Sequence, residues 1–342
     1  MSYDLKTIVR SIKKEYGTAS VASEHKDPVD YISTGNRAVD LMLGGKGMAF
    51  GYVSEWSGLS GSGKTLMLQK MLANAQETYD AIGIWLDREN AYTNARAGEL
   101  GINNEQVILA KPIDIPTVKS AEEFLKTTLT KTREKFPEAY IFVAKDSVSA
   151  FMKDQTGEDM GKKAKHLHDL FRAVLPLIDD KVSFHFTNQV TFSPGVMFGD
   201  TKTTTGGEGP KYYTTYRVAL TDKNKIKDDK RGGEIVGNYI HYYVVKTRLG
   251  PSHRSITIPF YYKEGIPELG GYVRMLANRG YVKPKNVAEF NKFKQKTVIY
   301  KDKQYTEDNV EKLLADNPEL LFDTWPEWGG SKLNVIHTEE QE

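Results

Sequence analysis

Hydrophobic positions in the first two thirds of the chain predict strands that alternate with helices. Short apolar runs typical of buried strands occupy residues 52–56, 81–87, 107–110, 140–144 and 182–186. Segments with a helical pattern lie between them, at 66–72, 117–136 and 167–178. This alternation favours an α/β core with a mostly parallel central sheet and helices on both faces. We assign this core to residues 31–262.

The later part of the pattern changes in two steps. Three strands are predicted with no helix between them, at 213–221, 239–247 and 256–262, the first two joined by a charged turn at 222–233. Such a series predicts antiparallel strands at the edge of the parallel sheet. From about Lys263 short elements dominate. We therefore expect a small α+β C-terminal domain over 263–342 that ends in an acidic tail.

The first thirty residues form a third unit in this prediction. Apolar residues recur at helical spacing and Gly17 can end the helix; they are Leu5, Ile8, Val9, Ile12 and Tyr16. A short strand is predicted over 18–23, followed by a polar linker. A single amphipathic helix on a linker cannot bury its own apolar face. It is expected to pack on the core or on a neighbouring subunit.

Composition narrows the classes of protein that fit. The chain has 342 residues, a net charge of +2 and no cysteine. These values exclude a polybasic nucleic-acid coat, disulfides, zinc fingers and thiol catalysis. No apolar run approaches the ~20 residues that a membrane helix needs, and the N-terminus lacks a signal-peptide pattern. The default expectation is a cytoplasmic enzyme.

One motif carries specific chemistry. The pattern G-x-x-x-x-G-K-[ST] is matched without exception by Gly58, Leu59, Ser60, Gly61, Ser62, Gly63, Lys64 and Thr65. It follows a predicted strand and precedes a predicted helix. Glycines let backbone N–H groups turn toward phosphate oxygens, and the helix N-terminus adds a positive dipole end. Lys64 is expected to reach the β- and γ-phosphates, and the Thr65 hydroxyl to hold Mg²⁺. A nucleoside triphosphate site is therefore predicted, against the alternative of a Gly/Ser surface loop.

Two acids complete this site in the prediction. Asp146 follows the strand at 140–144, where a second carboxylate would position Mg²⁺, although Lys145 before it is unusually polar for a buried strand. Glu89 follows another strand and is a candidate to orient an attacking water. A single acid at a strand end can equally cap a helix or be solvated. The prediction depends on their joint occurrence in a compatible order.

Several segments together resemble the RecA family of strand-exchange recombinases, including large-phage counterparts such as UvsX. The segments that carry the resemblance are 31–35, 39–40, 86–89 and 146–148, together with Asn188-Gln189, Gly195-Val196-Met197-Phe198-Gly199 and Thr203-Thr204-Thr205-Gly206-Gly207. The last two runs are similar to the second DNA-binding loop of the family. The resemblance spans about residues 5–280, and 282–286 is closer to the phage branch. It implies a RecA-like phosphate-loop ATPase fold.

The resemblance also implies roles for individual residues. Gln189 would sense the γ-phosphate and couple it to the order of the loop, although a glutamine there can also merely satisfy backbone groups. Lys246 and Arg248 resemble the pair that reaches the γ-phosphate of the neighbouring subunit, as an arginine finger does; without the resemblance they read as exposed strand charges. The nucleotide would then lie between subunits of a filament. The N-terminal helix would dock on the adjacent subunit.

DNA contacts are expected at two loops. The long loop at 190–210 would hold single strands through backbone N–H groups, threonine hydroxyls and apolar wedges, and its predicted contacts are Gly195, Val196, Met197, Phe198, Gly199, Thr203, Thr204, Thr205, Gly206 and Gly207. The first loop, at about 153–161, resembles the family at Met160 and Gly161. Lys165 and Arg172 on the following helix are candidate phosphate contacts, although lone basic residues on a helix are commonly only solvated.

Three departures from the family pattern concern specificity. Glu208 puts an acid where the family loop ends in a small amide. Arg96 stands at the position of an adenine-stacking tyrosine, where its guanidinium plane could still stack on the base. Residues 269–271 lack a tyrosine found near the base in relatives.

The main hypothesis is an ATP- and Mg²⁺-dependent DNA recombinase that forms helical filaments on single-stranded DNA and exchanges strands with homologous duplex DNA in recombination and repair. Single-strand-binding and mediator proteins are candidate partners, and the expected location is the cytoplasm with the nucleoid, or the host cytoplasm for a phage protein. The alternatives are a hexameric helicase with the same fold and a nucleotide-gated DNA-binding mediator with little turnover. The signature at 195–207 and the docking helix argue against the helicase, and Glu89, Asp146, Lys246 and Arg248 argue against the mediator.

Overall fold

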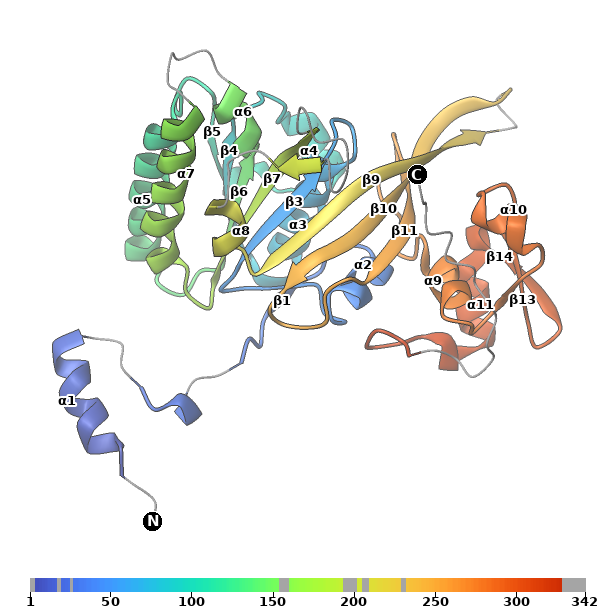
Figure 1. Cartoon of the computed structure of the whole chain (residues 1–342), viewed down its shortest axis with the longest axis horizontal. Coiled ribbons are helices and arrows are strands. Elements are labelled where there is room, and N and C mark those ends of the chain that lie inside the picture. Colours follow the sequence, from blue (N-terminus) through green and yellow to red (C-terminus); the bar gives the residue numbers. More distant parts are fainter. Residues whose placement is uncertain are drawn as a thin grey trace.

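The computed structural model describes residues 4–16, 20–24, 27–153, 160–192, 202–204, 209–228 and 232–327. Its main body is a twisted sheet with helices on both faces (Figure 1). Within the described residues this sheet has nine strands, in the order β11-β10-β9-β3-β7-β6-β4-β5 with β8 paired to β7. The predicted α/β class with a mostly parallel sheet is confirmed.

The strands from β3 to β5 are parallel, and so is the pairing of β3 with β9. Their bounds are β3 (Val53–Gly58), β4 (Ile82–Asp87), β5 (Val107–Ala110), β6 (Ile141–Asp146) and β7 (Val182–Phe192). The edge strands β9 (Tyr216–Asp228), β10 (Glu234–Thr247) and β11 (Ser255–Tyr261) are antiparallel to one another. The predicted antiparallel edge is therefore present, but β9 and β10 are longer than the sequence pattern suggested.

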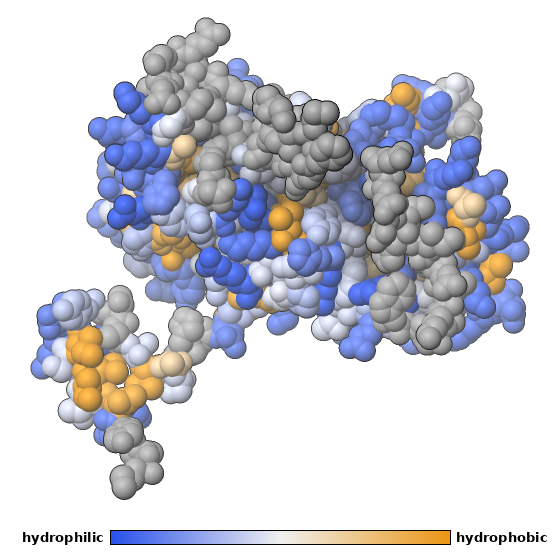
Figure 2. Space-filling view, in the orientation of Figure 1, coloured by the Kyte–Doolittle hydropathy of each residue, from blue (hydrophilic) through white to orange (hydrophobic). Residues whose placement is uncertain are grey.

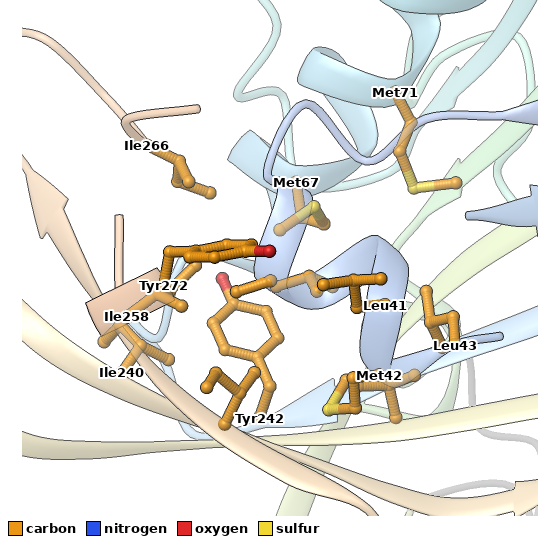
Figure 3. Packing of buried hydrophobic residues seen from close by; sticks show 14 of the residues in the cluster. Leu41, Met42, Leu43, Met67, Met71, Ile240, Tyr242, Ile258, Ile266 and Tyr272 are labelled. Carbon is orange, nitrogen blue, oxygen red and sulfur yellow. The ribbon is translucent and has the colours of Figure 1, made fainter. Parts of the chain in front are cut away.

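Helices cover the two faces of the sheet with separate apolar clusters. One cluster joins α2 (Arg37–Met42), α3 (Lys64–Tyr79) and α9 (Tyr272–Asn278) to the sheet; Figure 3 shows Met67 of α3 facing Tyr272 and Tyr242 across this core. The other joins α5 (Val118–Lys135), α6 (Val148–Lys153) and α7 (Met160–Val174) to the opposite face. Thr117 caps α5 by accepting a hydrogen bond from the backbone N–H of Ser120.

Smaller elements complete the described chain. They are α1 (Lys6–Tyr16), β1 (Tyr31–Ile32), β2 (Met48–Ala49), α4 (Asn94–Glu99), β8 (Lys202–Thr204), α8 (Gly209–Tyr213), β12 (Lys283–Pro284), α10 (Val287–Asn291), β13 (Thr297–Tyr300), β14 (Lys303–Thr306) and α11 (Val310–Asp316). Strands β12, β13 and β14 form a separate antiparallel sheet. No helix in the described ranges is long and apolar enough to cross a membrane.

Three expected local elements differ in the structure, and a fourth lies outside the described residues. Of the charged segment expected to be a turn at 222–233, residues 222–228 instead continue β9, because their backbone pairs with β10 as far as Asp228 opposite Glu234. Tyr213 belongs to helix α8 and not to the following strand. Residues 20–23 form no strand, since Ala22–Glu24 is a 3₁₀ turn. The acidic tail at 339–342 lies outside the described residues.

Helix α1 exposes an apolar face, as its sequence pattern predicted. It lies apart from the main body, and Figure 2 shows hydrophobic side chains gathered on it. Leu5, Ile8, Ile12 and Tyr16 are exposed, and no residue of the helix is buried. Exposure of these apolar side chains to water is unfavourable, so this face is expected to pack against a partner surface.

Lys145 is an unusual member of the apolar layer beside α6. The residue is 0% exposed, and its Nζ has no hydrogen-bond partner among the described residues. The amine lies 4.2 Å from the centroid of the Phe151 ring. Burial lowers the pKa of Lys145 to about 7, because the surrounding apolar side chains disfavour its charged form.

Lys145→Met is expected to stabilise the fold by roughly 1–4 kcal/mol at pH 7. The pKa of Lys145 in the folded state lies below its unfolded value of about 10.4. Burial of the charged amine therefore destabilises the wild-type fold most below pH 7, and this destabilisation decreases as the pH rises toward about 10.4. Thermal unfolding followed from pH 6 to 10 should show the gain shrinking with pH. Lys131→Met on the exposed face of α5 is the control, and an equal gain in both variants would refute the assignment.

Candidate nucleotide-binding site

The phosphate loop connects β3 directly to α3. Gly61 and Gly63 have φ angles of 76° and 82°, in the left-handed region that glycine adopts without strain. The Lys64 side chain folds back over the loop, and its Nζ donates to the carbonyl oxygens of Gly58 at 3.1 Å and Leu59 at 2.8 Å. The loop is thus a preformed concavity with an ammonium group at its rim, which suits a polyphosphate.

Asp146 is held against the start of α3. Its Oδ2 accepts a hydrogen bond of 2.7 Å from Thr65 Oγ1, and its Oδ1 accepts one from Thr187 Oγ1 on the adjacent strand β7. Burial raises the pKa of Asp146, the hydroxyl hydrogen bonds oppose that rise, and the nearby Glu89 and Asp87 carboxylates add to it. A carboxylate beside a hydroxyl is the kind of hard oxygen set that fits Mg²⁺. Sequence analysis missed Thr187, which a strand pattern gives no reason to select.

Glu89 lies just beyond the end of β4. Its Oε1 accepts hydrogen bonds from Ser147 Oγ and, at 3.5 Å, from Gln189 Nε2. Asp87 shapes the turn that carries Glu89, because its carboxylate accepts the backbone N–H groups of Ala91 at 3.0 Å and Tyr92 at 2.8 Å. An exposed carboxylate fixed in this way can accept a proton from a water.

A cavity of about 450 Å³ brings most of the predicted nucleotide residues together. Residues on its wall include Lys64, Thr65, Glu89, Arg96, Asp146 and Gln189. They come from the ends of β3, β4, β6 and β7, or from the segments that follow these strands, which all reach the same edge of the sheet. Their roles toward a nucleotide stay predictions.

The mouth of this cavity carries two aromatic side chains that sequence analysis missed, Phe260 and Tyr262. The Tyr262 hydroxyl donates to Asn238 Oδ1 at 3.0 Å. Arg96 lies beside this tyrosine, with its Nη1 bonded to Glu99 at 2.9 Å and to the Lys263 carbonyl at 3.2 Å. The guanidinium plane of Arg96 and the aromatic rings on the same cavity wall provide surfaces for stacking. The run Phe260-Tyr261-Tyr262 at a strand end was the available signal.

Lys246 and Arg248 lie elsewhere on the sheet. Lys246 Nζ donates to the Lys211 carbonyl at 2.7 Å, and Arg248 Nη2 donates to the Tyr212 carbonyl at 3.0 Å. Neither is among the described residues that line the cavity of the same chain. Burial lowers the pKa of Lys246, with Arg248 and Arg217 adding to the effect.

The predicted DNA-binding residues fall in four groups, of which one, Thr203 and Thr204, lies in β8. Met160 and Gly161 are in the first turn of α7, and Lys153 ends α6, so these residues are helical and not part of the loop that the sequence suggested; residues 154–159 between them lie outside the described part. Lys165 and Arg172 are exposed on α7. Outside the described residues lie Gly195, Val196, Met197, Phe198, Gly199, Thr205, Gly206 and Gly207, as does Glu208.

The segment predicted as a loop at 190–210 is partly ordered by sheet pairing. Strand β7 continues to Phe192, and β8 pairs with it in antiparallel register, with Val190 opposite Thr204 and Thr191 opposite Thr203. Helix α8 begins at Gly209. The loop proper is therefore shorter than predicted, because a strand that leaves the main sheet can still form a two-stranded ladder.

Known proteins resemble this chain over most of its length. The family model described as the RecA N-terminal domain matches residues 3–267. The chain is similar to proteins named Protein RecA from three bacteria. Identity is 30% over 289 residues with that of Chloroherpeton thalassium, covering 82% of this chain and 77% of the relative. Identity with the protein of Streptomyces rimosus is 28% over 328 residues, covering 92% of this chain and 81% of the relative. Identity with that of Gluconobacter oxydans is 29% over 326 residues, covering 92% of this chain and 89% of the relative.

Thr65→Val should remove the hydroxyl that contacts Asp146 and weaken magnesium-dependent nucleotide binding by about tenfold or more, because a lost polar contact to a charged group is worth ~1.5–3 kcal/mol. Titration of a fluorescent ATP analogue, with Mg²⁺ and with EDTA, measures this. Thr78→Val at the exposed end of α3 is the control. Equal affinities of Thr65→Val and wild type in Mg²⁺ would contradict the assignment.

Proposed function

This chain belongs to the RecA family, and from that membership we propose that it is an ATP-dependent DNA recombinase. It would form filaments on single-stranded DNA, pair them with homologous duplex and exchange strands. The observation that carries this proposal is the convergence of Lys64, Thr65, Asp146, Glu89 and Gln189 on one cavity. Each of these side chains has a role in phosphoryl transfer that its geometry suits.

The proposed hydrolysis assigns a separate task to each side chain. Lys64 binds the β- and γ-phosphates from the rim of the loop, and Thr65 and Asp146 would hold Mg²⁺. When bound, Mg²⁺ supplies charge neutralisation at the phosphates. Glu89 orients the attacking water and accepts its proton. Gln189 is hydrogen-bonded to Glu89 at 3.5 Å, so it is suited to respond to the loss of the γ-phosphate.

The proposed active site is completed by a second subunit. Lys246 and Arg248 carry positive charge outside the cavity of their own chain, and a neighbouring subunit would bring them to its γ-phosphate. The apolar face of α1 would dock on an adjacent copy, which explains why a helix with no buried residue exposes the apolar side chains of Ile8, Ile12 and Tyr16. ATP at such an interface would strengthen the filament, and its hydrolysis would weaken it.

DNA would bind along the side of the sheet that carries α7 and the segment after β7. Lys165 and Arg172 are seven residues apart on α7 and exposed, so both can meet a phosphate backbone. The Gly/Thr-rich run at 195–207 would supply backbone and apolar contacts without sequence preference. Homologous duplex, single-strand-binding proteins and mediators are the proposed further partners.

Hydrolysis of ATP should rise at least tenfold on addition of single-stranded DNA, because the loop proposed to bind DNA follows β7, the strand that carries Gln189. Glu89→Ala should abolish hydrolysis and retain ATP-dependent DNA binding. A coupled phosphate-release assay and oligonucleotide anisotropy measure the two properties. A wild-type rate of ATP hydrolysis that does not change when DNA is added would refute the proposal of a recombinase. Closed rings in electron micrographs would favour the alternative of a hexameric helicase.

Mixing two inactive variants tests the shared site. Lys64→Ala should lack a working phosphate loop, and Lys246→Ala should lack a cation for its neighbour. When the two variants assemble at random in a 1:1 mixture, about one interface in four combines an intact loop from one subunit with intact cations from the next. The mixture should therefore regain roughly a quarter of wild-type hydrolysis. A mixture as inactive as its components would show that both groups act within one chain.

A further inference from the structure

The carboxylate of Glu55 is buried in the middle of the sheet, away from the nucleotide cavity. Glu55 belongs to β3, three residues before Gly58, and is 0% exposed. Its Oε1 accepts a hydrogen bond of 2.8 Å from Asn188 Nδ2 on β7. Its Oε2 is paired with Arg217 Nε on β9, directly across the parallel ladder. One buried carboxylate therefore ties together three neighbouring strands.

Arg217 continues this connection to β8. Its Nη2 donates to Thr204 Oγ1 at 3.5 Å, and β8 is the strand that closes the segment after β7. Beside it lies a cavity of about 380 Å³ whose wall includes Leu59 of the phosphate loop, Thr204 and Arg217. Arg217 contacts Glu55 on β3 and Thr204 on β8. It therefore forms a polar link between these two strands along the wall of the unfilled cavity.

Strand β7 presents consecutive side chains to the two sites. Gln189 faces Glu89 on the nucleotide side, and Asn188 faces Glu55 on the other side of the sheet. This follows from the twofold alternation of a strand. A small shift of β7 that follows the state of the nucleotide would therefore also act on the Glu55–Arg217 pair and, through it, on β8.

The same pair lies beside the cations that are proposed to act on the next subunit. Arg217 and Arg248 act together to disfavour the charged form of Lys246, and Glu55 opposes them. A negative charge at Glu55 therefore offsets part of the repulsion within a cluster of three cations. Its removal would leave Arg217 without its ionic partner and increase the positive potential at Lys246.

We propose that Glu55 and Arg217 are positioning residues that couple the nucleotide-bearing end of β3 to β8 and the DNA-binding segment. This inference rests on the proposed function. An ion pair buried in this way adds little net stability over apolar residues of the same size, whereas its fixed geometry links three strands and β8. The pair contacts neither nucleotide nor reacting atoms, so its effect is on coupling and not on the chemical step.

Glu55→Gln tests the link while preserving the shape of the side chain. The measured quantity is the ratio of affinities for a fluorescein-labelled thymidine oligonucleotide with and without a non-hydrolysable ATP analogue and Mg²⁺. We expect this ratio to fall about tenfold in the variant, with the affinity for the analogue alone changed less than about twofold. By reciprocity, the gain in analogue affinity caused by DNA should fall by the same factor.

Glu307→Gln is the matched control. Glu307 is also a buried carboxylate paired with an arginine, Arg274, at 2.7 Å, but it lies on the C-terminal side of the fold and does not line the described wall of either cavity beside the phosphate loop. Both variants should lower the midpoint of thermal unfolding, and only Glu55→Gln should lower the affinity ratio. Equal ratios in the two variants, or a parallel loss of all affinities in Glu55→Gln, would overturn the inference.

Arg217→Lys gives a second measurement that does not remove a buried charge. Lysine keeps a cation beside Glu55 but has one nitrogen in place of the forked guanidinium, so it cannot reach both Glu55 and Thr204. The affinity ratio should fall here too, with folding retained; a wild-type ratio would overturn the inference. A wild-type protein that binds no oligonucleotide with the analogue would instead refute the proposed function itself.

Discussion

The parallel pairing of β3 with β7 is the constraint on which the rest of the molecule depends. Its register sets Gly58, where the phosphate loop begins, opposite Gln189, where β7 leaves the nucleotide region. Parallel strands bring their carboxyl ends to one edge of a sheet, and ligands bind there in open α/β folds. The acids after β4 and β6 reach the same edge for the same reason. A slip of one residue would turn every one of these side chains to the opposite face.

Alternation along the strands lets one sheet serve two purposes. On β6, Asp146 faces Thr65 and the nucleotide cavity, whereas its neighbour Lys145 faces Phe151 in the apolar layer. On β7, Gln189 and Asn188 divide in the same way. Burial of so many polar groups is costly unless each is satisfied. Asp146 meets this condition through two hydroxyls, and burial of Lys145 favours its neutral form by lowering its pKa to about 7.

Much of the proposed chemistry needs more than one copy of the chain. A cavity of about 450 Å³ with cationic, acidic and aromatic walls already resembles a nucleotide site. Lys246 at the end of β10 and Arg248 just after it are not among the described residues that line the cavity of their own chain, and α1 exposes its apolar face. Assembly would satisfy both at once: it buries the α1 face and brings charge to the phosphates. Nucleotide state and assembly are then one equilibrium, linked by mass action.

Residue type and short-range spacing were enough to predict the phosphate loop, the alternation of strands and helices, the antiparallel edge and the apolar face of α1. The sequence could not determine that Met160 is helical, that β8 returns to pair with β7, or that residues 222–228 continue β9, since those depend on contacts with segments distant in the chain. Nor could it select Thr187, Glu55 or Arg217. Nothing local distinguishes these residues, and only the register between strands brings their side chains to the carboxylates and the cavity that they serve.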